Sequence, residues 1–319
     1  MEEIEIFHQE LLSWYDKNGR DHLPWRQTRN IYYIYISEIM LQQTQVNRVM
    51  EQFYPNFLEK YPTLEILART PIEDVLASWS GLGYYSRARN IHKTANECPL
   101  ELPDSMSELL KLSGIGRYTA SAICSFGYEQ NVSVVDTNIA RVFKRYCGHI
   151  EVKDDVVWES ADKYLNHTAS RSHNLALMDL GSMVCTPKNP ECKRCPLEYN
   201  CVGKENPEMY TKKKKTVYES KDLFYGICIK DDAIALKKAT GNMYKGMLEL
   251  PSVEACEENL IGSYKHSYTK YRLSVYLYTI DIKKLDKIDE IIWASLEDMD
   301  KLPLSTLTKK GLMRIDETL

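Results

Sequence analysis

The stretch CTPKNPECKRCPLEYNC, residues 185–201, gathers four cysteines into one short segment. Four thiolates with this spacing, C-x6-C-x2-C-x5-C, can bind zinc tetrahedrally or hold a [4Fe–4S] cluster. The single C-x2-C pair is compatible with both, although a zinc ribbon usually carries two such pairs further apart. Four unrelated buried thiols are disfavoured, because cysteine is scarce elsewhere in the chain. The candidate ligands are Cys185, Cys192, Cys195 and Cys201.

The overall composition is that of an ordinary globular protein long enough for two domains, with 319 residues, 44% of them hydrophobic and 27% charged. The acidic, amphipathic N-terminus lacks the features of a signal peptide, and no apolar run is long enough to cross a bilayer. The odd cysteine count argues against a disulfide framework, so we expect a reducing, cytoplasmic compartment. The net charge of −4 does not itself indicate a nucleic-acid partner, although local basic patches and backbone amides can still contact phosphates.

The pattern of apolar residues changes along the chain. Residues 1–203 show helical spacing in segments such as MEQFYPNFLEKY, TLEILA, IEDVLASW and MSELLKL. Residues 204–216 are polar, contain the run Lys212–Lys215, and are expected to form a solvated linker. Residues 217–319 begin with strand-like patterns, including a hairpin around Asp231-Asp232, and end in a helical pattern. The fold class predicted is a mainly α N-terminal region followed by an α+β domain.

A second motif, LLKLSGIGRYTASAI at residues 109–123, predicts two helices joined by a tight turn. Gly114 and Gly116 permit backbone geometries that other residues resist, and they allow main-chain N–H groups to approach a phosphate. A lone G-x-G between helices is usually only a turn.

Together, the hairpin and the cysteine loop closely resemble the endonuclease III and MutY branch of the helix-hairpin-helix DNA glycosylases. The resemblance implies a [4Fe–4S] cluster with a structural, DNA-facing role, and it places Lys193 and Arg194 at phosphates. Ser113 stands where this family normally has proline. Residues 217–319 resemble the MutT-like, Nudix-like domain of MutY enzymes more weakly, through GMLELPS at 246–252, and contain no Nudix box.

Glu38 is a lone acid within the apolar run IYYIYISEIMLQQTQV, residues 31–46. Burial would raise its pKa toward neutrality, as a general acid requires, but periodicity alone equally allows an exposed position on an amphipathic helix. The string SEIMLQQTQV resembles the MutY catalytic helix, and that resemblance implies that Glu38 is the catalytic acid.

Asp136 precedes a helical pattern in VSVVDTNIARVFKR, residues 132–145, where an N-cap is the simplest interpretation. The string also resembles the VDGN segment that supplies the family's catalytic Asp, with Thr137 replacing Gly and Asn138 matching a pocket residue. A helix-start carboxylate can fill both roles, because N–H donors keep it ionised.

The resemblance implies a reaction in which Glu38 protonates an extruded adenine and Asp136 stabilises an oxocarbenium-like sugar. Tyr118 occupies the position where bifunctional relatives carry a lysine nucleophile. Since a phenol cannot form a Schiff base, we expect a monofunctional glycosylase with no strong AP-lyase activity.

Other contacts are implied by the resemblance alone. Tyr84, in GLGYYSRARNIHK, matches the aromatic residue that inserts into the duplex, Gln43 matches its polar partner, and Arg87 is expected at DNA, although a solvated arginine is the simpler alternative. Trp25 and Arg26, in LPWR, match pocket residues, with a buried aromatic and a surface Arg as the plain alternatives.

The family reads 8-oxoguanine with a Phe-Ser-His loop, which aligns with Tyr268, Thr269 and Lys270 in this chain. Tyr and Thr preserve aromatic and hydroxyl character, whereas Lys270 preserves neither an acceptor nor a planar ring. The sequence of this stretch is equally compatible with an ordinary antiparallel strand.

The resulting hypothesis is a monomeric adenine DNA glycosylase of base excision repair, acting on double-stranded DNA with adenine opposite 8-oxoguanine or guanine, and nucleoid-associated if bacterial. The alternatives are a mismatch glycosylase with another base choice, such as thymine, and a non-catalytic, cluster-bearing DNA-binding protein.

Overall fold

The computed structural model describes residues 2–211, 217–241, 243–255, 259–288 and 290–316. Its backbone contacts divide into two compact units. Unit 1 comprises Met1–Ala68 and Lys93–Lys214, and unit 2 comprises Arg69–His92 and Lys215–Leu319.

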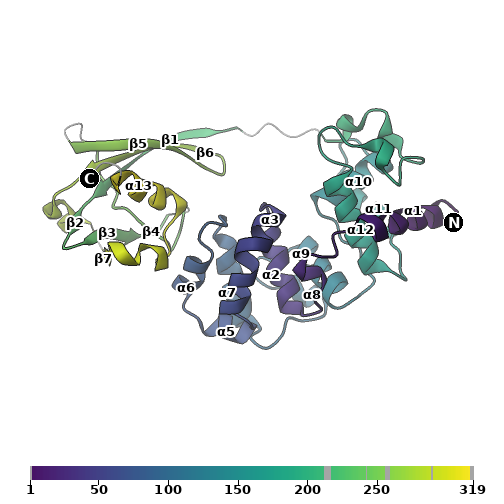
Figure 1. Cartoon of the computed structure of the whole chain (residues 1–319), viewed down its shortest axis with the longest axis horizontal. Helices are drawn as coiled ribbons and strands as arrows, with labels where there is room; N and C mark the ends of the chain where they lie inside the picture. The colour runs from purple at the N-terminus through teal and green to yellow at the C-terminus, as the bar shows by residue number, and fades with distance from the viewer. Residues whose placement is uncertain (1, 212–216, 242, 256–258, 289, 317–319) are drawn as a thin grey trace. The chain divides into compact units, whose positions relative to one another are not determined.

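Unit 1 is helical, as the apolar spacing predicted (Figure 1). Its helices are α1 (Glu2–Asn18), α2 (Ile31–Leu41), α3 (Val46–Arg48), α4 (Tyr54–Lys60), α5 (Leu64–Arg69), α8 (Met106–Leu109), α9 (Arg117–Ala122), α10 (Thr137–Tyr146), α11 (Asp154–Lys163) and α12 (Ser170–Met183). Helix α6 (Ile72–Ser78) belongs to unit 2, and α7 (Ser86–Glu97) begins there and ends in unit 1.

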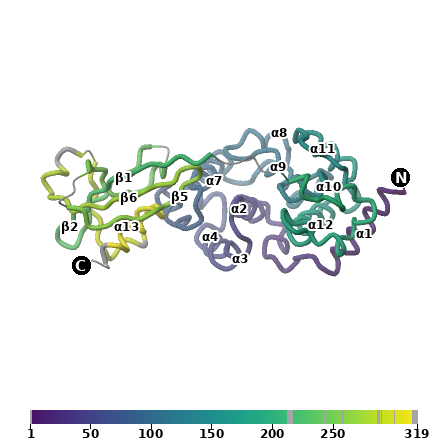
Figure 2. Tube along the Cα trace, turned by 90° about the horizontal axis from the view of Figure 1, so that it is seen from above, coloured from purple at the N-terminus to yellow at the C-terminus, as the bar shows by residue number. Residues whose placement is uncertain are grey.

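The core of unit 1 forms where α1 and α10 pack against α12, and the three helices lie together in both views (Figures 1 and 2). Apolar residues of α10 recur at helical spacing, so that Ile139, Val142 and Phe143 are all buried on one face. Phe7 of α1 stacks on Phe143 with a centroid distance of 6.2 Å.

Helix α2 differs from its neighbours because it is apolar on every side, as expected of a helix surrounded by protein. Asn30 caps its first turn by accepting a hydrogen bond from the backbone N–H of Tyr33 at 3.1 Å. Every residue from Ile34 to Met40 is buried. A polar side chain in this segment therefore has no solvent-facing stripe to occupy.

Helices α8 and α9, with the turn that joins them, form the expected helix-turn-helix. Gly114, in the turn, has φ +76°, a left-handed conformation that favours glycine. Gly116 is extended and precedes the first turn of α9. A wider π-helical turn, Ile123–Gly127, continues α9 and packs against α2.

Unit 2 has the strand-containing architecture that the sequence predicted. Its strands are β1 (Glu219–Ile227), β2 (Ile229–Lys230), β3 (Ala233–Lys238), β4 (Leu248–Glu249), β5 (Leu260–Tyr268), β6 (Tyr271–Thr279) and β7 (Ile291–Ser295), and α13 (Thr306–Asp316) follows them. In one sheet β6 lies between β1, which is parallel to it, and β5, which is antiparallel. In the other sheet β3 pairs with β2, β4 and β7.

Turn chemistry decides two connections in unit 2. Asp231 and Asp232 both have positive φ and connect β2 to β3, which confirms the predicted hairpin. The long alternating segment around residue 270 is broken into β5 and β6, because Thr269 adopts φ +49° and reverses the chain.

The observed unit boundaries differ from the pattern-based ones. Arg69–His92 joins unit 2 through contacts such as Lys238 Nζ to Glu73 Oε1 at 2.9 Å. Periodicity identifies a helix but not the core it packs against, so this could not be predicted. In the expected linker, Pro207–Thr211 is a 3-10 helix packed on α10, whereas Lys212–Lys215 lies outside the described residues. No helix in the described ranges has the length and apolarity needed to span a bilayer.

Candidate active site

A cavity of about 790 Å³ opens within unit 1. Side chains from α2, α9 and the start of α10 line it, among them Glu38, Tyr118 and Asp136. Its volume is typical of sites that enclose a small organic molecule. The two carboxylates chosen from sequence thus line the same cavity.

Glu38 is buried, with 4% of its surface exposed. The Tyr118 hydroxyl donates a hydrogen bond to Glu38 Oε2 at 2.5 Å. Burial raises the pKa of Glu38 to about 7, and repulsion from Asp136 adds to this effect, while the Tyr118 hydrogen bond and Arg26 oppose it. A carboxyl group with this pKa can hold and release a proton near neutral pH.

Asp136 is the N-cap of α10. Its Oδ1 accepts hydrogen bonds from the backbone N–H groups of Asn138 at 2.9 Å and Ile139 at 2.7 Å, and its Oδ2 accepts one from Asn138 Nδ2 at 2.7 Å. Burial raises the pKa of Asp136, and these donors together with Arg141 oppose the rise by stabilising its anion. The capping role and the cavity-facing position coexist.

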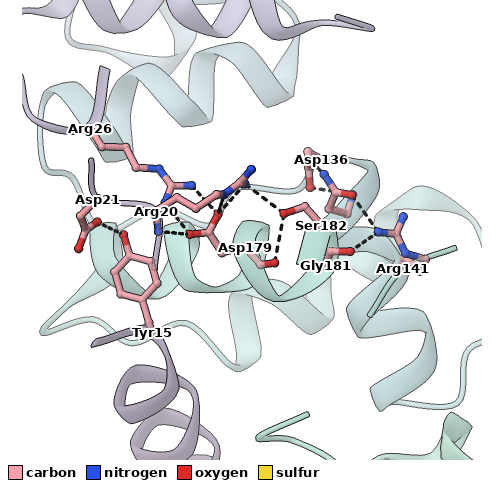
Figure 3. A network of polar contacts seen from close by, with 10 residues as sticks. Tyr15, Arg20, Asp21, Arg26, Asp136, Arg141, Asp179, Gly181 and Ser182 are labelled. Atoms are coloured by element: carbon pink, nitrogen blue, oxygen red, sulfur yellow. Dashed lines mark hydrogen bonds and ion pairs between the residues drawn. The ribbon is translucent and has the colours of Figure 1, made fainter. Parts of the chain in front are cut away.

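Arg26 is buried rather than at the surface, and a residue that sequence reasoning missed holds it there. Its Nη1 and Nη2 donate to the two carboxylate oxygens of Asp179 at 2.6 and 2.8 Å (Figure 3). Arg20 also binds Asp179, through its backbone N–H and its Nε. Burial alone would raise the pKa of Asp179, but Arg26 and Arg20 bring it below its ordinary value. A lone acid in the apolar stretch LALMDLG was the available signal, the same as for Glu38.

A second arginine connects the Asp136 cap to the cysteine loop. Arg141 Nη2 donates to Asn138 Oδ1 at 2.8 Å. It also donates to the Gly181 carbonyl at 2.5 Å (Figure 3). Its Nε donates to the carbonyl of Cys185 at 2.6 Å. Gly181 permits this close packing, because a Cβ there would lie 2.7 Å from the Cβ of Asn138.

Arg145, with 2% of its surface exposed, holds the cysteine loop through several hydrogen bonds. It donates to the carbonyls of Cys185, Thr186, Pro187 and Pro207, and its Nη1 lies 3.2 Å from the Sγ of Cys185. The guanidinium of Arg145 therefore lies directly beside one of the four candidate ligand sulfurs.

The four cysteines of the loop are free thiols that line one small cavity, with Arg145 in its wall. This all-sulfur donor set fits an iron–sulfur cluster. The fit lies in the chemistry of the four donors, since within the described ranges their side chains are not already gathered into a group that could hold a metal ion. Lys193 and Arg194 are exposed on the same loop, and Arg194 pairs with Glu191.

The remaining predicted residues of unit 1 also reach the large cavity. Trp25 is buried in its wall and packs edge-on against Tyr54, with 5.3 Å between ring centroids. Gln43, Gly114 and Gly116 are exposed residues at its lining. Gln43 adopts φ +58°, an unusual conformation for a residue with a side chain.

Tyr84 and Arg87 lie in unit 2. Tyr84 is 42% exposed and has φ +48°. Arg87 differs from the expected DNA-contacting surface cation, because it is 6% exposed and its Nη2 donates to the carbonyls of Leu82 and Gly83. Its guanidinium is therefore directed into the neighbouring loop rather than into solvent.

The residues expected to read the lesion form the tip of the β5–β6 hairpin. Tyr268 is half-buried against Tyr244, with 4.7 Å between ring centroids, and Thr269 is exposed in the turn. Lys270 Nζ lies 2.5 Å from Glu219 Oε1. This ion pair directs the lysine along the sheet toward the start of β1.

Residues 36–166 match the family model described as HhH-GPD superfamily base excision DNA repair protein. The chain is 36% identical over 264 residues to the adenine DNA glycosylase of Buchnera aphidicola subsp. Schizaphis graminum, covering 79% of this chain and 76% of that protein. It is 31% identical over 340 residues to the enzyme of the same name from Buchnera aphidicola subsp. Baizongia pistaciae, covering 97% of each chain.

Among solved structures, a thermostable thymine-DNA glycosylase superposes with a TM-score of 0.60 and 29% sequence identity. The match covers 97% of that protein but 64% of this chain. The shared part is a glycosylase core, and a third of this chain extends beyond it.

Proposed function

This chain belongs to the adenine DNA glycosylase family of base excision repair proteins, and from that premise we propose that it hydrolyses the N-glycosidic bond of adenine paired with 8-oxoguanine or guanine. The observation that carries the proposal is that Glu38 and Asp136 line one cavity, with Glu38 titrating near neutrality. Enzymes commonly tune a general acid in this way.

Glu38 is the proton donor. Once the adenine nucleotide leaves the duplex stack, the protonated carboxyl group transfers its proton to a ring nitrogen, N7, and the base becomes a better leaving group. Because burial raises the pKa of Glu38 to about 7, a substantial share of these carboxyl groups carries a proton at neutral pH.

Asp136 is the electrostatic stabiliser. As the glycosidic bond breaks, positive charge develops on the sugar. A carboxylate held in place by three hydrogen-bond donors can stabilise that charge without reorganising. Water completes the hydrolysis. Asn138, Arg26 and Trp25 shape the pocket around the base.

Tyr118 makes the reaction monofunctional. Its hydroxyl is committed to Glu38, and burial together with the two carboxylates raises its pKa well above the ordinary value. No amine takes its place as a nucleophile, so we expect no trapped imine and no strand nicking by this residue.

The partner is double-stranded DNA, bound by a monomer in the cytoplasm, or at the nucleoid in a bacterium. Gln43 and Tyr84 enter the duplex, and Gly114, Gly116, Lys193 and Arg194 contact phosphates. The strand-containing part of unit 2 is a MutT-like domain, and its residues Tyr268, Thr269 and Lys270 read the opposite base. Cys185, Cys192, Cys195 and Cys201 would hold a [4Fe–4S] cluster, which supplies structural cross-linking of the loop.

The test is base release from duplexes containing A opposite 8-oxoguanine, A opposite G, and T opposite G, scored with and without alkali. We expect adenine release from the first two and strand cleavage only after alkali. Release of thymine would favour the mismatch enzyme represented by the thymine-DNA glycosylase neighbour. Tight DNA binding without base release would favour a non-catalytic module.

Two controls sharpen this test. Glu38→Gln keeps the shape of the side chain but cannot donate an acidic proton, so base release should disappear while DNA binding persists. Borohydride added during the reaction should trap no covalent adduct. Visible absorbance of the purified protein and its iron content distinguish an iron–sulfur cluster from zinc.

A further inference from the structure

We propose that Arg87 and Trp79 are positioning residues that hold the backbone at Tyr84, so that its ring is set for insertion into the duplex. This inference rests on the inserting role proposed for Tyr84. It assigns Arg87 to the interior of the loop and replaces the phosphate contact that its sequence context suggested.

The carbonyl of Gly83 receives two donors. Trp79 Nε1 donates to it at 3.1 Å, and Arg87 Nη2 donates to it at 3.1 Å. Arg87 Nη2 also lies 3.1 Å from the carbonyl of Leu82. The peptide immediately before Tyr84 is therefore fixed from two directions by side chains of α7 and of the residue after α6.

The same guanidinium lies close to two aromatic rings. Its Cζ lies 5.4 Å from the ring centroid of Trp79 and 5.6 Å from that of Tyr84. Trp79 is fully buried and Arg87 nearly so, whereas Tyr84 remains 42% exposed. The buried side chains of Trp79 and Arg87 thus support one exposed aromatic ring.

The backbone of Tyr84 requires such support. Its φ of +48° lies in the left-handed region, which a bulky residue adopts only when its surroundings impose it. Removing the two donors to the Gly83 carbonyl would let Tyr84 relax to ordinary geometry, and the ring would then point elsewhere. Because the Tyr84 ring is already held in this orientation, less conformational entropy is lost when DNA binds.

A double-mutant cycle tests the inference with the full-length protein. Affinity is measured for a duplex with 8-oxoguanine opposite a 2′-fluoro-adenosine that resists cleavage, and Tyr84→Ala should weaken binding about 5-fold to 150-fold, the range for one base–aromatic stack. Arg87→Ala should cost a similar factor, and the double variant should lose no more than Tyr84→Ala alone.

Salt dependence separates positioning from phosphate binding. The slope of log affinity against log salt should be unchanged in Arg87→Ala, whereas loss of one phosphate contact reduces its magnitude by about 0.9. Arg87→Lys keeps the charge but not the forked donor, so it should behave like Arg87→Ala and also tests the proposal if the alanine variant is unstable. Lys93→Ala removes a more exposed cation from the same helix, and the affinities measured in the cycle should not change when it is introduced.

The outcomes are distinguishable. Additive losses with a reduced salt slope overturn the inference and make Arg87 a phosphate contact. Loss of affinity in Tyr84→Ala with full affinity in both Arg87 variants also overturns it, and leaves the inserting role intact. No loss in Tyr84→Ala removes the inserting role itself and the positioning role with it, while adenine release by the unmodified protein still tests the rest of the proposed function.

Discussion

The Tyr118 hydroxyl lies 2.5 Å from Oε2 of Glu38, and this contact joins the second helix of the hairpin to the buried helix α2. The two residues are 80 positions apart in the chain. The bond favours ionised Glu38, because a phenol donates to a carboxylate. It therefore limits how far burial can raise the pKa of the proposed proton donor.

Replacing Tyr118 with phenylalanine tests this balance. Tyr118→Phe removes the donor while keeping the ring, so the pKa of Glu38 should rise above its present value of about 7. If protonated Glu38 is the active form, the alkaline limb of the single-turnover rate of adenine release moves to higher pH. An unshifted limb would show that another group controls it.

Glu38→Gln should abolish base release and stabilise the fold at alkaline pH. Because the folded-state pKa is raised from 4.5 to about 7, the carboxyl group costs stability that grows as pH rises from about 4.5 and levels off above about 7. The amide avoids this cost, worth up to about 3 kcal/mol from a shift of this size. Urea unfolding of both proteins should show little difference at pH 4.5 and the largest gain for the variant at pH 8.

Gly181→Ala should weaken both stability and catalysis. The added Cβ would meet Asn138 Cβ at 2.7 Å and the Asn138 carbonyl at 2.8 Å, so the start of α10, which carries Asp136, must shift. We expect a loss of about 1–3 kcal/mol in unfolding free energy and slower base release. Gly262→Ala is the matched control, since nothing lies within 4 Å of its Cβ, and its stability should change by less than about 0.5 kcal/mol.

Arg145→Met should loosen the cysteine loop. The variant keeps an apolar stem but removes every hydrogen bond to the loop, including the contact with Cys185 Sγ. We expect less iron per protein after purification and faster loss of visible absorbance under a chelator. Arg194→Met serves as the control, because Arg194 is exposed and bonds only to Glu191 among the contacts described above. Equal iron retention in the two variants would contradict the anchoring role of Arg145.

Local features of this chain were predictable because they depend on residues close together in sequence. The cap at Asp136, the turn at Gly114, the Asp231-Asp232 hairpin and the cysteine spacing each need only a few neighbours, and the structure has each of these local arrangements. The helical and strand-containing regions likewise follow from the period of the apolar residues.

Other features could not be predicted from local pattern. The sequence around Glu38 allowed this residue to be exposed or buried. Because α2 is apolar on all sides, the spacing of its apolar residues does not show which face is buried. Arg87 fits a basic DNA contact in sequence, yet its loop encloses it. Membership of Arg69–His92 in unit 2 depends on packing partners far along the chain.

The order of amino acids specifies which chemical groups this protein has available: two acids in distinctive strings, a phenol in place of an amine, and four clustered thiols. The chemical properties of these groups depend on the folded arrangement. Arg26 meets Asp179 across 153 positions, and Glu38 loses its solvent to helices from several segments. Ionisation depends on solvent and on charges nearby in space, and both are set when distant parts of the chain pack together.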